Sequence, residues 1–207
     1  MKLVLDDQPI DFTETGDATL REVVERISLE LKESQRVISE IVLDGRHIGG
    51  WDDPELSQMT VGQCQNMRLI SEEPRNLAHK VLHEIASYMP RIKEALIETS
   101  SKIQSGAEKD GMQLLEQVTA TWAELYQGFQ SAILVTGLDL NMVTVEGRTF
   151  LAINEEIHKF LDHVTVMVQE NRMLELSDVL EYEIAPRIPL VEEGIYRVIK
   201  EMEKKPN

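Results

Sequence analysis

The sequence is poor in cysteine, in aromatic residues and in positive charge, and each shortage excludes a class of protein. The one cysteine, Cys64, can form no intrachain disulfide, and zinc-binding cysteine clusters are missing. Only 5% of the residues are aromatic, so aliphatic residues and methionine must build the core. Acidic residues number 37 against 21 basic ones, and the net charge of −16 repels phosphate backbones and anionic lipids. We therefore expect neither a nucleic-acid partner nor a membrane partner.

Long apolar runs are missing as well. No stretch approaches the roughly 18 consecutive apolar residues that a membrane-spanning helix needs. The apolar run at residues 3–5 ends in Asp6 and Asp7, which makes it too short for a signal peptide. These patterns predict a cytoplasmic protein.

Residues 1–73 alternate between strand-like and helix-like periods, which predicts a small α/β domain. Residues 3–5 form a short apolar run, residues 10–12 alternate apolar with polar, and the turn-forming Asp6–Pro9 lies between them, so we expect a β-hairpin. Thr19-Leu20-Arg21-Glu22 has the form of a capping box, and apolar residues follow it at helical spacing. Alternation returns around Ile41 and Leu43, and a last short strand holds Met67 and Leu69.

This order of strand, strand, helix, strand and strand resembles the ubiquitin-like β-grasp. Conjugated ubiquitin-like modifiers end in Gly-Gly, whereas Gly49-Gly50 is internal here and the chain continues past Pro74. The resemblance therefore implies a docking module and not a conjugated modifier.

Residues 74–207 have a period of 3.6, which predicts helices that are apolar on one side. Four such helices with short connections favour an antiparallel four-helix bundle and an overall α+β fold. We place the helices at about 75–104, from Leu115 to near Gly137, at 150–167, and at about 174–203. Pro186 and Pro189 should kink or break the last helix. Trp122–Leu125 and Asp178–Glu183 resemble segments of uncharacterised bacterial helical-bundle proteins.

Glu155-x-x-His158, followed by Asp162, has the spacing with which helical bundles hold paired metal ions. Such sites need inward-facing ligands and a second copy of the motif on another helix, and this chain has one copy only. On a helical wheel the three side chains point away from the apolar stripe. We interpret them as solvent-facing residues and predict no metal there.

His79 and His83 share a helix face, but zinc proteases place a glutamate between their two histidines, and here Glu84 follows the pair. Both histidines lie opposite the apolar stripe, so we interpret them as solvent-facing. Cys64 has no neighbouring base to activate it, and the loop 45–50 lacks the phosphate-binding glycine motifs. We predict neither a catalytic residue nor a cofactor.

Partner-binding candidates come from two loops. Trp51 lies among glycine, aspartate and proline, where it either folds back over the sheet edge or the helices or, if exposed, is a contact anchor. The loop 138–145 is unusually apolar and should not stay hydrated, so it either caps the helices or forms an interface. Its candidate contact residues are Leu138, Leu140, Met142 and Val143.

These observations favour a non-enzymatic adaptor or scaffold that binds a protein partner or a second copy of itself. The segment 178–189 is a further place where a partner would bind. One alternative is an acidic secretion or flagellar-export chaperone, since such chaperones are small, acidic and often helical. A metal-dependent enzyme with ligands on the helices is another, and a small molecule bound in a methionine-lined core stays open.

Overall fold

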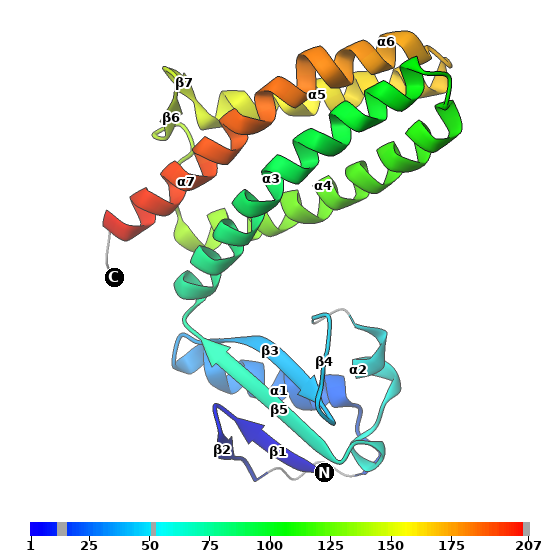
Figure 1. The fold of residues 1–207 in the computed structure, drawn as a ribbon. Helices are drawn as coiled ribbons and strands as arrows, with labels where there is room; N and C mark the ends of the chain where they lie inside the picture. The colour runs from blue at the N-terminus through cyan, green and yellow to red at the C-terminus, as the bar shows by residue number, and fades with distance from the viewer. Residues whose placement is uncertain (12–15, 51–52, 205–207) are drawn as a thin grey trace. The chain divides into compact units, whose positions relative to one another are not determined.

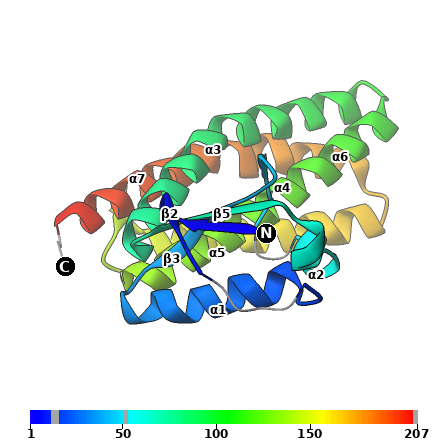
Figure 2. The same cartoon turned by 90° about the horizontal axis from the view of Figure 1, so that it is seen from below.

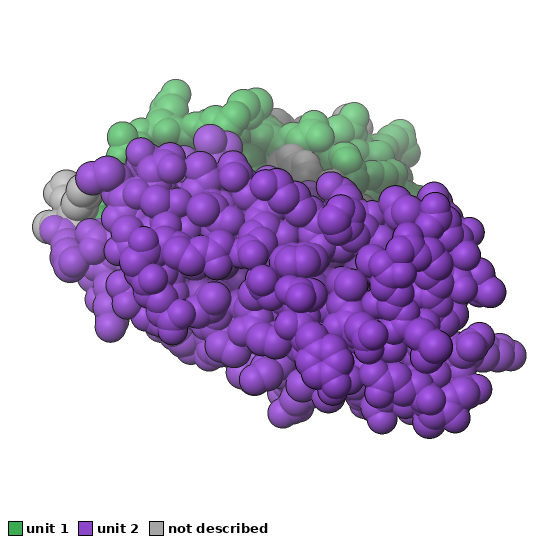
Figure 3. Space-filling model, turned by 90° about the horizontal axis from the view of Figure 1, so that it is seen from above, with its two compact units in different colours: residues 1–77 green, residues 78–207 purple. Residues whose placement is uncertain are grey.

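The computed structural model describes residues 1–11, 16–50 and 53–204. The chain divides into two compact units, Met1–Leu77 and Ala78–Asn207, which Figure 3 distinguishes by colour. The fold is α+β, with a small N-terminal sheet and a helical remainder, as predicted. The sequence places the domain boundary at residue 73, whereas the units separate at residue 77, inside the first long helix.

A five-stranded mixed sheet forms the first unit (Figure 1), in the order β2-β1-β5-β3-β4. Its central pair, β1 and β5, is parallel, and the other pairs are antiparallel. The strands are β1 (Lys2–Leu5), β2 (Gln8–Pro9), β3 (Val37–Leu43), β4 (Arg46–His47) and β5 (Asn66–Glu72).

The N-terminal hairpin has a tighter turn than the sequence predicts. Only Asp6 and Asp7 form it, both with positive φ, and β2 already begins at Gln8. Aspartate tolerates this left-handed backbone better than most residues, so two residues suffice to reverse the chain. Phe12, the end of the predicted second strand, lies outside the described residues.

The helix α1 (Leu20–Glu33) covers one face of the sheet (Figures 1 and 2). Its capping box is confirmed: the Thr19 hydroxyl accepts from the amide of Glu22, whose carboxylate accepts from the amide of Thr19 at 2.8 Å. The buried face of α1 packs with the sheet into a core of its own. This core contains Leu3, Leu20, Val23, Val24, Ile27, Ile41, Leu43, Met67 and Leu69.

Asp6, in the hairpin turn after β1, connects this turn to β5 and to the residue that precedes β3. Its carboxylate accepts from the amide and the hydroxyl of Ser71, at 2.7 and 2.6 Å, and from the guanidinium of Arg36 at 3.4 Å. Partial burial pushes the pKa of Asp6 upward, but the hydrogen bonds from Ser71 and Arg36 outweigh that effect. The pKa of Asp6 therefore lies below its ordinary value.

Two short helices connect β4 to β5. They are α2 (Pro54–Gln58) and the 3₁₀ turn η1 (Val61–Gln63). Asp53 caps α2 by accepting from the amide of Glu55, and Pro54 occupies the first turn, where its missing N–H costs nothing. The candidate Trp51, just upstream, lies outside the described residues.

Long helices build the second unit around one apolar core. They are α3 (Pro74–Gln104), α4 (Glu108–Thr136), α5 (Phe150–Gln169) and α7 (Ile188–Lys204), preceded by the short α6 (Met173–Asp178). Gly137 ends α4 in the left-handed conformation, at φ 62°, at the predicted position. Across the described part of the chain, no helix is long and apolar enough to cross a membrane.

The predicted break before α7 takes the form of a π-helix, η2 (Val179–Ile184), followed by a 3₁₀ turn, η3 (Ala185–Arg187). Pro186 lies in the 3₁₀ turn and Pro189 in the first turn of α7, where neither displaces a regular helical hydrogen bond. Glu181 fastens the π-helix to α3, because its carboxylate accepts from the hydroxyl of the fully buried Ser100 at 2.8 Å.

Candidate functional site

The three candidate metal ligands of α5 differ in their exposure to solvent. Glu155 and Asp162 are exposed, as predicted, but His158 is half-buried against α4. Its ring meets the ring of Tyr126 edge-on, with the centroids 4.4 Å apart, and its Nε2 is buried without a hydrogen-bond partner among the described residues. The prediction of a solvent-facing His158 is therefore wrong. The wheel directs His158 away from the apolar stripe of α5, but it does not show that α4 covers this part of the helix.

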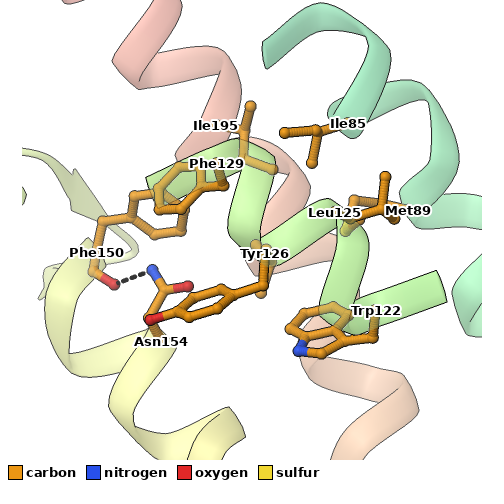
Figure 4. A pocket seen from close by; sticks show the side chains of 10 residues that line it. Ile85, Met89, Trp122, Leu125, Tyr126, Phe129, Phe150, Asn154 and Ile195 are labelled. Atoms are coloured by element: carbon orange, nitrogen blue, oxygen red, sulfur yellow. Dashed lines mark hydrogen bonds between the residues drawn. The ribbon is translucent and has the colours of Figure 1, made fainter. Parts of the chain in front are cut away.

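Asn154, on the same side of α5, is the polar residue that does face the core. It is 7% exposed, and its side-chain amide donates to the carbonyl of Phe150 at 2.8 Å. This bond, drawn dashed in Figure 4, satisfies the amide and lets a polar side chain sit among apolar ones. Asn154 and His158 are four residues apart, so they line the same contact with α4.

A small cavity lies beside Asn154 and is lined by residues of α3, α4, α5 and α7. Figure 4 shows Tyr126 and Trp122 of α4 beside Asn154, with Ile85 and Met89 of α3 at the upper right of the view, farther from Asn154. Its volume of about 20 Å³ is room for about one water molecule. The other lining residues are Leu125, Phe129, Phe150, Val191 and Ile195. A cavity of this size is a packing feature of the core and lies far below the volume of a typical ligand site.

The two histidines of α3 meet residues of α7. The rings of His79 and His83 lie 4.6 Å apart, and His83 meets Tyr196 edge-on at 6.1 Å. His83 is exposed as predicted, whereas His79 is half-buried, with its Nε2 3.4 Å from the Glu203 carboxylate. Within residues 1–11, 16–50 and 53–204, no three His, Cys, Asp or Glu side chains come together as a set of metal ligands.

Cys64 lies in the core of the first unit. It is 3% exposed, and burial raises the pKa of its thiol. A thiol with a raised pKa is a weak nucleophile at neutral pH, so the position of Cys64 indicates a packing role.

Some residues of the apolar loop 138–145 cap the helices, and another is exposed, as a residue at an interface would be. Val143 and Val145 are buried in the helical core, and Leu138 and Leu140 pack half-buried against it. Val143 is therefore a core residue and not the exposed partner contact that we predicted. Met142 has the opposite environment, since 81% of it is exposed.

A two-stranded hairpin follows Met142 and explains this division. Its strands are β6 (Thr144–Val145) and β7 (Arg148–Thr149), joined by Glu146 and Gly147, both at positive φ. The hairpin contacts α7 (Figure 1), and the amide of Phe150 donates to the carbonyl of Val143 at 2.8 Å. These bonds bury Val143 and Val145 and turn Met142 toward solvent.

A groove of about 360 Å³ lies between this hairpin and α7, and it is the candidate functional site. Its volume falls in the range of roughly 300–1,000 Å³ that is typical of binding sites. One wall consists of Met142, Val143 and Thr144. The other wall is a face of α7 that contains Glu193, Tyr196, Arg197, Lys200, Glu201 and Lys204. We call this feature the α7 groove.

Positive charge gathers in the α7 groove on an acidic chain. Residues 78–207 contain 13 basic and 21 acidic residues, and three of the basic ones, Arg197, Lys200 and Lys204, lie within eight positions on one face of α7. Arg197 pairs with Glu193 and donates to the carbonyl of Thr144, and Lys204 pairs with Glu201. Lys200 is exposed, and the described residues offer it no ionic partner.

Ion pairs hold the hairpin in place. Arg148 of β7 pairs with Glu156 of α5, and the other carboxylate oxygen of Glu156 lies 3.1 Å from Nε of Arg187. Arg187 also lies over the ring of Phe160, 4.7 Å from its centroid. The hydrogen bond from Arg148 and the neighbouring Arg187 hold the pKa of Glu156 below its ordinary value. The hairpin wall is thus preorganised, which lowers the entropic cost of binding.

Glu156→Gln should lower the free energy of unfolding of the full chain by about 1–2 kcal/mol near neutral pH, because Arg187 loses a partner. The folded-state pKa of Glu156 is depressed, so its contribution is present above the unfolded pKa and is lost as the pH falls through the folded value. Urea unfolding followed from neutral to acidic pH measures both effects.

Glu155→Gln is the matched control for this substitution, since Glu155 is exposed on the same turn of α5 and should change stability little. Equal losses in the two variants would contradict a structural role for the Glu156 pairs.

The sequence contained signals for residues that we did not single out. Glu146-Gly147 between short β-prone segments is a hairpin signal, and Arg197, Lys200 and Lys204 recur at helical spacing. Each of these two features can be predicted from neighbouring residues alone. That the hairpin and the basic face of α7 lie side by side, some fifty residues apart in the sequence, cannot, because it depends on the docking of the hairpin on α7.

Comparison with known families gives two matches. Residues 80–203 match a family described as "Domain of unknown function (DUF8042)", and residues 1–71 match the "TP0873 N-terminal domain". No curated protein and no solved structure matches the chain.

Proposed function

Since the chain belongs to the DUF8042 family, whose description names no activity, we propose from the structure that it is a non-enzymatic protein-interaction protein that docks a partner in the α7 groove. The exposed Met142 beside this groove is the observation that carries the proposal. A large apolar side chain at 81% exposure, held at the edge of a preorganised groove, is a typical contact anchor.

The surroundings of Met142 support the same function. Tyr196, 38% exposed, lines the opposite wall, so both walls offer an apolar contact between polar side chains. Apolar anchors within a polar rim are the usual anatomy of a protein interface. Leu134, near the end of α4, is a further exposed apolar residue at 84%.

We further propose that the first unit is a β-grasp-like docking module and the second a four-helix bundle. The strand order β2-β1-β5-β3-β4, with a parallel central pair and α1 across one face, supports the first interpretation. The shared core of α3, α4, α5 and α7 supports the second. A cytoplasmic location remains part of this proposal.

Site-specific photo-crosslinking in host cells tests the groove as a docking site. A photoreactive amino acid at Thr144 of the full chain should give a discrete adduct with a partner. Met142→Glu should reduce that adduct about tenfold or more, because it places a charge on the apolar anchor of the interface. An adduct of twice the chain's mass would name a second copy as the partner.

Leu174→Glu is the matched control, because Leu174 on α6 is 71% exposed and does not line the groove. This variant should leave the Thr144 adduct unchanged. If Met142→Glu and Leu174→Glu give equal amounts of adduct, or if no adduct forms, the α7 groove is not a docking site.

A further inference from the structure

We infer that the α7 groove takes an acidic segment of a partner protein, one that carries an apolar side chain between its carboxylates. This inference rests on the proposed function and names the chemistry of the partner. It follows from the distribution of charge in the groove and from the position of Met142.

Lys200 is the central observation. It lies between Arg197 and Lys204 on the same face of α7, and both of those cations already have carboxylate partners within the chain. Lys200 has none among the described residues, so its ammonium is free to pair with an incoming carboxylate. Glu193 and Glu201 offset the charges of these two neighbours, so Lys200 supplies the net positive charge of the groove.

Arg197 holds the two walls of the groove in a fixed arrangement. Its guanidinium donates to the carbonyl of Thr144 as well as to Glu193, so it holds the two walls of the groove together. A partner meets an arrangement that exists before binding, which leaves less conformational entropy to be lost.

Charge pairing and apolar burial together decide which segments the groove can bind. Net repulsion slows the approach of any acidic segment, but it is screened beyond about 8–10 Å at physiological ionic strength, so the contact charges decide binding. A segment of carboxylates alone would find little to hold it. A segment that also places an apolar side chain against Met142 and Tyr196 gains burial as well as charge pairing.

The test is titration of the purified full chain with a fluorescent peptide of glutamates flanking a leucine and a phenylalanine, followed by anisotropy. We expect Lys200→Glu to weaken binding about tenfold, because it replaces an attraction by a repulsion at the contact. The affinity should also fall as salt is added. Lys159→Glu, an exposed position on α5 with the same change in charge, should leave the affinity unchanged.

Three results would overturn the inference. They are no measurable binding of the acidic peptide, equal loss in the Lys200→Glu and Lys159→Glu variants, or tighter binding of the peptide with lysine in place of glutamate. The Thr144 crosslink with its Met142 dependence stands apart from these outcomes. A groove that crosslinks a partner but ignores the acidic peptide keeps the proposed function and loses this partner class.

Discussion

Gly194→Ala should destabilise the helical unit by about 1–3 kcal/mol, even though alanine favours a helix by about 1 kcal/mol over glycine. A Cβ at position 194 would lie 2.2 Å from the ring of Phe150, far inside contact distance. That ring is fully buried and meets the ring of Phe129 edge-on at 5.7 Å, so it has little room to move. Urea unfolding followed by the helical circular dichroism signal measures the loss.

Gly128→Ala is the matched control, also at a glycine inside a long helix. A Cβ there would lie 3.6 Å from side-chain atoms of Val81 and Ile85, which is ordinary contact. We therefore expect this variant to be neutral or slightly stabilising. If both alanine variants lose the same stability, the close approach of α7 to α5 is not the cause.

Phe150→Leu provides a second check through coupling. A smaller side chain at 150 makes room for the added methyl group, so the double variant should lose clearly less than the sum of the two single losses. Additive losses would show that residue 194 does not act through the Phe150 ring.

Asp6→Ala should destabilise the first unit by about 2 kcal/mol, because Ser71 and Arg36 lose the carboxylate to which they donate. Ser71 is 5% exposed, so its amide is left with little access to water as a substitute. Hydrogen exchange of the full chain should show faster exchange in β1 and β5 and unchanged exchange in α4 and α7, since the two units have separate cores.

Asp7→Ala separates the hydrogen bonds from backbone strain. Asp6 and Asp7 both have positive φ, so alanine is strained at either position. The carboxylate of Asp7, however, is exposed, and among the described residues its ionic partner is Arg68 on the surface. A loss for Asp7→Ala as large as that for Asp6→Ala would assign the effect to the turn and not to Ser71.

Asp6 also makes the first unit acid-sensitive. Its folded-state pKa is lowered, so its stabilising contribution is complete above the unfolded pKa and disappears as the pH falls through the lower folded value. In the Asp6→Asn variant, the stability of the first unit should change less as the pH falls. The pH dependence of hydrogen exchange in the helical unit should stay as it is in the unsubstituted chain.

The elements that the sequence predicts well are those whose causes are local. Thr19 and Glu22 cap each other, Gly137 ends α4, and the α-helical pattern changes to a 3₁₀ turn at Pro186 before α7 begins; in each case a few neighbouring residues decide the outcome. Pro90 marks the limit of this reasoning, because α3 continues through it. A proline has the same local chemistry in both helices, and the packing of α3 decides whether the helix survives.

The site was less predictable, because its residues owe their exposure to tertiary contacts. Met142 and Val143 are adjacent apolar residues in one loop, and the hairpin buries one and exposes the other. His158 and Asn154 likewise depend on which flank of α5 receives α4. A helical wheel gives the direction of a side chain, but not the neighbour that covers it.

The parallel pairing of β1 with β5 constrains how the chain can fold while it is being made. Residues 2–5 leave the ribosome well before residues 66–69, with which they pair. Until β5 emerges, β1 can pair with β2 but not with β5, and a lone two-stranded hairpin is only marginally stable in water. The first unit must therefore wait for nearly its whole length to be synthesised, whereas the helices that follow can form through local contacts as they appear.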